Sequence, residues 1–152
     1  MTLWAMIPSD GRIRHRILFQ TIKSERYVNI LNEIVVPQLK SMRYIHHHYQ
    51  QDGASVHSSR VVRNLLNNEL SNHWIGRAGP ISWPPRSPDL SINDFWLWSY
   101  LRCKVYQDEL VLGVNRVFQE MEHEMVSNCF QNFIKRCEKC IAQNGGHFEQ
   151  YL

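Results

Sequence analysis

The sequence has 152 residues, with 17 basic and 14 acidic side chains, a formal net charge of +3, and 43% hydrophobic residues. This length is typical of one domain, residues 1–152, and the hydrophobic content excludes a disordered segment. The small charge excess permits a nucleic-acid partner without requiring one. We expect an intracellular protein without a membrane span, because no run approaches about 18 apolar residues and the first residues lack the features of a signal peptide.

The first twenty residues are predicted to form a β-hairpin. An apolar stretch over residues 1–7 precedes the turn signal Pro-Ser-Asp-Gly, and three arginines then alternate with isoleucine and histidine over residues 12–17. Alternation with a period of two is typical of a strand.

A helix is predicted next, over residues 25–40, with Ser24 as its cap. Its apolar residues recur at the spacing of one helical face: Tyr27, Ile30, Leu31, Ile34, Val35 and Leu39. Pro37 lies late in this pattern and should distort the last turn.

Residues 43–51 are the next predicted strand, which ends at Asp52. The three histidines at 46–48 look like a metal cluster, but neighbouring side chains of a strand point to opposite faces, which argues against one shared site. Gly53 lets the backbone turn with positive φ and lets a ligand approach closely. A carboxylate at the carboxyl end of a strand is well placed to hold a hard cation. The alternative is an Asp-Gly turn without chemistry.

The rest of the chain is predicted to be largely helical. In order we expect a helix over 57–70, a loop over 73–80, a short strand over 81–83, a proline-rich loop over 84–89, an aromatic helix from Ser91, one or two helices over 112–143, and a helix end at 144–146. The pattern predicts a mixed α/β fold. Phe95 and Trp98 are interpreted as core residues rather than as base-stacking residues. The spacing of the four cysteines fits no common zinc finger, which favours partly buried thiols on helices.

Asp94 lies one turn into the aromatic helix, where the positive helix dipole stabilises a carboxylate. Asp89, in the preceding loop, is interpreted as a loop-capping residue. The spacing between Asp52 and Asp94 is weak information by itself.

Two longer motifs are more specific. The stretch QQDGASVHSSRVVRNLL, followed by WIGRAGPISWPPRSPDLSINDFWLWSYLRCKVY, resembles the catalytic domain of mariner-type transposases of the cut-and-paste superfamily. That family carries a QDGAxxH strand end and an SPDLxPxD or SPDLxPxE helix start, in this order and at a compatible spacing. The resemblance extends to RCEKCIAQNGGHFEQYL at the end of the sequence.

The resemblance implies a ribonuclease H-like fold, with a mixed sheet flanked by helices and three acids that hold two magnesium ions. Manganese is the expected substitute. Asp52 matches the second acid, and Asp94, not Asp89, matches the third. The implied reaction is hydrolysis of a DNA phosphodiester and attack of the freed 3′-hydroxyl on target DNA, with the two metals activating the nucleophile and neutralising the leaving oxygen. The resemblance also implies DNA as partner, a possible homodimer, a nuclear location, and neither a membrane nor a small-molecule substrate.

The first acid of the family, in a word like SDEAHF before the hairpin, has no match. Asp10 lies in the hairpin turn, and Glu25 and Glu33 belong to the first helix, so none is a credible replacement. We therefore expect an amino-terminally truncated domain without its first, central strand, whose sheet edges are either exposed or re-paired. We also expect it to be catalytically inactive as it stands, because two carboxylates do not hold both ions.

Smaller departures concern DNA recognition and the helix that carries Asp94. The proline of SPDLxPxD is Ile92 here, and the usual apolar residue before the acid is Asn93, which should loosen the helix start. The helix-turn-helix domain of the family has no counterpart, so sequence-specific DNA binding is not expected.

Four residues are candidates for contact with nucleic acid. His57 matches the histidine of QDGAxxH and is either a phosphate or water contact near the metals or simply a residue at a helix start. Arg60, Arg63 and Arg86 are either phosphate-positioning residues or solvated side chains. For the whole chain, the alternatives are a retained nucleic-acid-binding or partner-binding module and a decayed gene copy without function.

Overall fold

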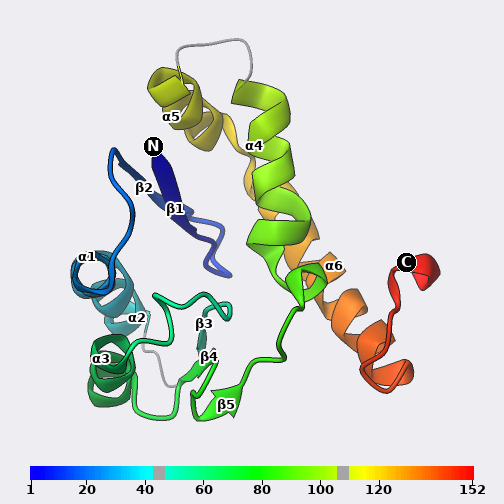
Figure 1. Ribbon diagram of the computed structural model, residues 1–152. Helices are drawn as coiled ribbons and strands as arrows, with labels where there is room; N and C mark the ends of the chain where they lie inside the picture. Colours follow the sequence, from blue (N-terminus) through cyan, green and yellow to red (C-terminus); the bar gives the residue numbers. More distant parts are fainter. Residues whose placement is uncertain (43–46, 106–109) are drawn as a thin grey trace. The chain divides into compact units, whose positions relative to one another are not determined.

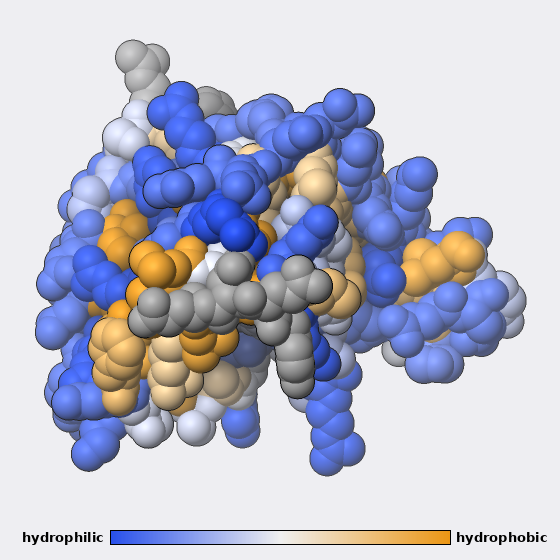
Figure 2. Space-filling model, turned by 90° about the horizontal axis from the view of Figure 1, so that it is seen from above, coloured by the Kyte–Doolittle hydropathy of each residue, from blue (hydrophilic) through white to orange (hydrophobic). Residues whose placement is uncertain are grey.

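The computed structural model describes residues 1–42, 47–105 and 110–152. The chain divides into two compact units, of which the first comprises residues 1–3 and 18–86 and the second comprises residues 4–17 and 87–152. Figure 1 shows short strands and predominantly helical structure. Hydrophilic residues cover most of the face in Figure 2, with hydrophobic patches between them. None of the helices in the described ranges has both the length and the apolar character that a membrane crossing requires.

The strands are β1 (Thr2–Met6), β2 (Arg14–Leu18), β3 (Tyr49–Gln50), β4 (Trp74–Gly76) and β5 (Ile81–Ser82). The α-helices are α1 (Ser24–Ile30), α2 (Val36–Ser41), α3 (Arg60–Leu70), α4 (Trp98–Val105), α5 (Leu110–Glu120) and α6 (His123–Ala142). Two π-helical turns, η1 (Leu31–Val35) and η4 (Asn93–Leu97), and two 3₁₀ turns, η3 (Pro88–Leu90) and η5 (Glu149–Tyr151), complete the described elements.

The predicted hairpin is confirmed: β1 pairs with β2 in a two-stranded sheet. Its turn is held by Asp10, whose carboxylate accepts a hydrogen bond from the Arg12 amide at 3.0 Å. Gly11 has a φ of 77°, a conformation that glycine adopts without strain, and a Cβ at this position would overlap the His123 ring. Asp10 therefore serves the turn, as its position in the sequence suggests.

The first unit packs helices beside a parallel sheet of order β3-β4-β5, in which Tyr49 is paired with Trp74 and Ile75 with Ile81. α1 packs against α3. The buried hydrophobic residues of the first unit are Tyr27, Ile30, Leu31, Val35, Val36, Leu39, Tyr49, Val62, Leu66, Leu70 and Trp74. The predicted loop over 73–80 is wrong for residues 74–76, which form β4, whereas residues 77–80 do form a turn. Trp74 is fully buried, and added Cβ atoms at Gly76 and Gly79 would lie 3.1 and 2.8 Å from its ring, so these glycines make room for the indole.

The predicted helix over 25–40 forms with two differences. Ser24 is the first helical residue rather than the cap, and Lys23 occupies the cap position without a side-chain hydrogen bond. Pro37 lies in the first turn of α2, directly after η1. Proline lacks the amide hydrogen and clashes with the carbonyl four residues back in an ordinary helix. The wider turn η1, directly before α2, accommodates it.

The second unit contains most of the hairpin, α4, α5 and α6, and α4 packs against α5. Its buried hydrophobic residues are Trp4, Ala5, Leu90, Leu97, Leu101, Val105, Val114, Val117, Val126, Cys129 and Phe148. The predicted helix end over 144–146 is confirmed, because the Gly145 amide, at a φ of 79°, bonds the Cys140 carbonyl at 2.9 Å. Cys137 and Cys140 are partly buried on α6, as predicted.

The strands of the described residues form two separate sheets, β1-β2 and β3-β4-β5. The expected alternatives for a sheet without its central strand were exposed edges or re-paired strands. Among the described residues, β3 and β5 are the edge strands of the second sheet, and the choice between the two alternatives stays a prediction.

Candidate active site

Asp52 lies two residues beyond β3, in a turn that its own side chain stabilises. Its Oδ1 accepts a hydrogen bond from the Ala54 amide at 3.0 Å and lies 2.5 Å from His57 Nδ1. The hydrogen bond with His57 lowers the pKa of Asp52 most strongly, partial burial opposes this, and the Ala54 amide lowers the pKa further. The carboxylate is therefore held in its charged form, as a metal ligand requires.

A chain of buried hydrogen bonds through Gln51, Tyr27 and Tyr49 stabilises this turn. The Gln51 amide, 5% exposed, donates from Nε2 to the His57 carbonyl at 2.9 Å and accepts at Oε1 from the Tyr27 hydroxyl at 2.9 Å. The Tyr49 hydroxyl lies 2.8 Å from that of Tyr27, whose ring is 4.5 Å from the His57 ring. Burial raises the pKa of Tyr49 to about 12, so this hydroxyl stays protonated. The glutamine of the QDGA motif thus fixes both ends of the Asp52 turn.

Gly53 differs from its prediction. It is absent from the described residues with positive φ, and a Cβ built on it would meet nothing within 4 Å. The turn does not require a glycine for backbone conformation, so what Gly53 provides is open space beside the Asp52 carboxylate.

Asp94 lies on the π-helical turn η4. Its amide bonds the Ser91 carbonyl at 2.9 Å, and its Oδ1 accepts a hydrogen bond from Trp98 Nε1 at 3.1 Å. Asn93, which departs from the family pattern, donates from Nδ2 to the Ala5 carbonyl of β1 at 3.1 Å. The start of this helix is therefore tied to the hairpin and not loose. Single π-helical turns occur often at functional sites.

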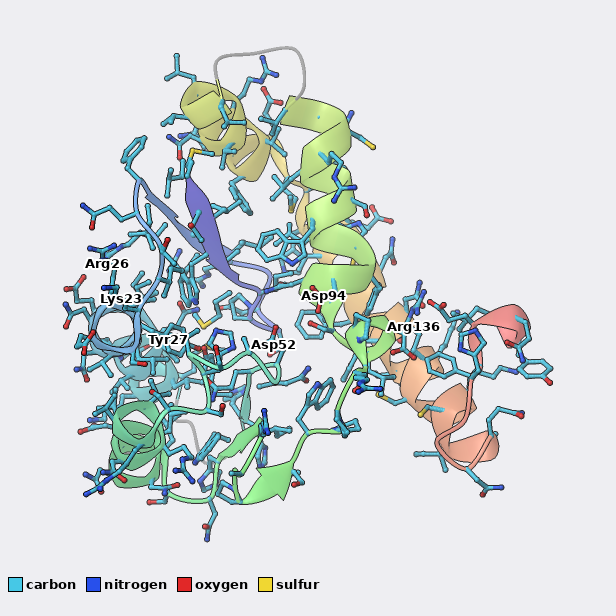
Figure 3. The ribbon with its side chains drawn as sticks, viewed as in Figure 1. Lys23, Arg26, Tyr27, Asp52, Asp94 and Arg136 are labelled. Carbon is cyan, nitrogen blue, oxygen red and sulfur yellow. The ribbon has the colours of Figure 1, made fainter. Side chains whose placement is uncertain are left out.

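Arg136 of α6 holds the segment that leads to Asp94 (Figure 3). Its guanidinium donates to the Asp89 carbonyl at 3.0 Å, lies 4.4 Å from the Phe95 ring centroid, and approaches the Glu149 carboxylate at 3.5 Å. Its side chain is only 13% exposed. Sequence analysis assigned Arg136 no role, and its low exposure shows that it is not a solvated side chain. The interpretation of Phe95 and Trp98 as core residues is only partly right, because both are partly buried and Leu97 is the core residue of this turn.

Known structures with the same fold were found for this chain, although its sequence has no match among families or curated proteins. A structure of the Mos1 transposase catalytic domain with raltegravir and Mg matches with a TM-score of 0.74 at 20% identity, over 97% of this chain and 76% of that chain. The crystal structure of the mariner Mos1 paired end complex with Mg matches with a TM-score of 0.76 at 21% identity, over 97% of this chain and 44% of that chain. This chain has the fold of the Mos1 mariner catalytic domain.

The mariner catalytic-domain fold is ribonuclease H-like and mixed α/β, so the predicted fold class is confirmed. The match covers 97% of this chain and therefore includes residues of both units. At 20% identity the likeness concerns the fold.

Within the mariner fold, the arginine candidates differ in exposure. Arg60 is the first residue of α3 and is exposed. Arg63, one turn later, is partly buried, and its Nε is buried without a hydrogen-bond partner. Arg86 is exposed in a turn with a φ of 56°. Arg60 and Arg86 are thus accessible to a partner, whereas Arg63 is less so.

The described residues do not form a complete metal site. Asp52 belongs to the first unit and Asp94 to the second. In residues 1–42, 47–105 and 110–152, no group of three or more His, Cys, Asp or Glu side chains could hold a metal ion. Of the three histidines at 46–48, position 46 lies outside the described residues, and the ring of His48 lies 5.4 Å from that of His73. The two acids are suitable hard oxygen ligands, but the set for two magnesium ions is not present here.

Proposed function

We propose that these 152 residues are part of a mariner-type transposase and that Asp52 and Asp94 are two of the three acids of its centre for magnesium-dependent DNA strand cleavage and transfer. The observation that carries this proposal is the agreement of motif and fold. Both acids occupy the positions of the QDGA and SPDLxPxD motifs, and the chain has the mariner fold over 97% of its length. Structures of Mos1 with this fold were solved with Mg, with Mn and with a transposon end.

The surroundings of the two acids support a role as ligands. Each carboxylate has one oxygen that is bonded by a neighbouring ring, Asp52 by His57 and Asp94 by Trp98. Partners of this kind orient a metal ligand and are needed for its full affinity. Both hydrogen bonds to Asp52 fall on Oδ1, so we expect Oδ2 to face an ion. A bound divalent ion would supply Lewis-acid activation of the phosphodiester.

A metal-binding measurement tests the assignment of the two acids. Mn²⁺ added to the protein should bind weakly, as followed by its electron paramagnetic resonance signal, and both Asp52→Asn and Asp94→Asn should weaken this binding. Asp89→Asn is the matched control, because Asp89 lies in the same motif and is not assigned as a ligand. Mn²⁺ binding that is unchanged in both variants, or weakened equally by the control, would overturn the assignment.

We further propose that the chain does not cleave DNA by itself, because only two of the three acids of the family pattern are matched. Supercoiled DNA incubated with the purified chain and Mg²⁺ or Mn²⁺ should stay supercoiled on a gel. Cleavage that is present in the wild type and lost in Asp52→Asn would refute this part of the proposal. A circular dichroism spectrum of folded protein is the control for a negative result.

Three expectations follow from the proposal and rest on the resemblance to the family: DNA as partner, a homodimer, and a nuclear location. Sedimentation of the purified chain tests the second, and a fluorescent fusion expressed in cells tests the third. Fluorescence anisotropy of a labelled DNA duplex tests the first.

A further inference from the structure

An open hollow of about 530 Å³ lies between the segment after β2 and the start of α1. All the residues that line it are polar or charged: Gln20, Thr21, Lys23, Glu25, Arg26 and Asn29. The hollow belongs entirely to the first unit and shares no residue with the Asp52 turn.

Arg26 is fixed in place on one side of this hollow. Its guanidinium donates to the Gln20 side chain and to the Thr21 carbonyl, the latter at 3.2 Å. A guanidinium has five N–H donors, so these two bonds leave donors for a ligand while they restrict the side chain to one orientation. The entropy cost of ordering this arginine is therefore paid in part before a ligand arrives.

Lys23 provides a second cation (Figure 3). It is exposed, it makes no side-chain hydrogen bond at the start of α1, and no ion pair involves it within the described residues. With Glu25 as the one acid, the lining has one net positive charge. The amides of Gln20 and Asn29 and the Thr21 hydroxyl supply neutral hydrogen-bonding groups.

We propose that this hollow binds a backbone phosphate of a DNA strand, with Arg26 and Lys23 as its cationic contacts. Arginine forms paired hydrogen bonds with phosphate oxygens, and lysine adds a point charge. The hollow is open at the surface, as a site for one phosphate of a polymer must be. The proposal rests on the proposed function in that DNA is taken as the partner, but it involves neither Asp52 nor Asp94.

Fluorescence anisotropy of a labelled DNA duplex, measured at increasing salt concentration, tests the proposal. Each phosphate contact contributes about 0.9 to the slope of log affinity against log salt for duplex DNA. The double variant Lys23→Ala/Arg26→Ala should therefore bind more weakly, with a slope smaller by about 0.9, because the hollow holds one phosphate. The matched control is Lys135→Ala/Lys139→Ala, which removes the same charge from exposed positions of α6 and should keep the wild-type slope.

Asn29→Phe tests the hollow without a change of charge. Asn29 is exposed, so the variant should fold, and its ring should occupy the hollow and weaken DNA binding several-fold. Equal effects of the two double variants would mean that only net charge matters, and an unchanged slope in Lys23→Ala/Arg26→Ala would mean that no contact exists here. Either result overturns the proposal. Binding of inorganic phosphate without binding of the duplex would also overturn it, because the site would then hold the free anion only.

The same assay separates this proposal from the proposed function. Asp52→Asn and Asp94→Asn test the metal centre, and neither residue lines the hollow. Mn²⁺ binding that is unchanged by those two substitutions, together with a smaller slope in Lys23→Ala/Arg26→Ala, would support the phosphate site in the hollow and refute the proposed metal centre.

Discussion

The stacking of Arg136 on Phe95 should contribute measurably to the stability of the turn that carries Asp94. The guanidinium lies 4.4 Å from the ring centroid, and the Arg136 side chain is 13% exposed. A cation over an aromatic ring contributes about 0.5–1 kcal/mol when exposed and about 2 kcal/mol or more when desolvated. Since this pair is largely buried, we expect a coupling free energy of about 1.5–2 kcal/mol.

Two substitutions isolate this interaction. Arg136→Met keeps an unbranched side chain without the guanidinium, and Phe95→Leu keeps an apolar side chain without the ring. Arg136→Met also loses the charged hydrogen bond to the Asp89 carbonyl, about 1.5–3 kcal/mol, but removes the buried Nε that has no partner. We therefore expect Arg136→Met alone to lower the free energy of unfolding by about 2–4 kcal/mol.

Urea unfolding of the wild type, both single variants and the double variant gives the coupling through a double-mutant cycle. Circular dichroism and tryptophan fluorescence must give coincident transitions, because the chain divides into two units. Arg102→Met, an exposed change on α4, is the control and should shift stability by less than about 0.5 kcal/mol. A coupling below about 0.3 kcal/mol would refute the stacking interaction.

Three further predictions concern protonation and the hairpin turn. The pKa of Asp52 is lowered from its usual value of 3.8, so its charged form stabilises the fold at pH values above 3.8, and this stability is lost as the pH falls through the lowered pKa. Asp52→Asn should therefore flatten the acid limb of a curve of unfolding free energy against pH. Identical acid limbs in the wild type and the variant would refute this. The pKa of Tyr49 is raised from 10.0 to about 12, so the native state keeps this proton longer than the unfolded chain does. Stability should therefore fall by up to about 2.7 kcal/mol between about pH 10 and pH 12, and urea unfolding of Tyr49→Phe should lack this part of the loss. Gly11→Ala should destabilise by about 1–3 kcal/mol, because of its φ of 77° and overlap with the His123 ring, and a melting temperature within error of the wild type would contradict this.

The elements that sequence reasoning found are those whose signal is local. The hairpin, α3 and the helix end at Gly145 each depend on residues within a few positions of one another, so periodicity and turn chemistry suffice. β4 was missed because Gly76 and the nearby Gly79 are typical of a loop, although both accommodate the Trp74 ring. That requirement depends on how the indole packs, which a local pattern does not contain.

The candidate site was only half predictable for the same reason. Asp52 and Asp94 were identified through motif words, whereas their supports were not. Arg136 acts on a carbonyl 47 positions away, and Tyr27 bonds a glutamine 24 positions away. Tyr27 was correctly predicted to be buried, but nothing in a helical apolar face indicates that its hydroxyl has a partner on a neighbouring strand end.

The direction of the Asp94 side chain depends on the wide, π-helical winding of η4. Leu97 and Leu101 fix the register of the helix that follows, since both are buried. If the same residues wound as an ordinary α-helix, everything before the turn would rotate by about 100° around the axis, because the wider turn accommodates one extra residue. Such a change of winding would turn the carboxylate away from its present direction, even though the sequence itself would be unchanged.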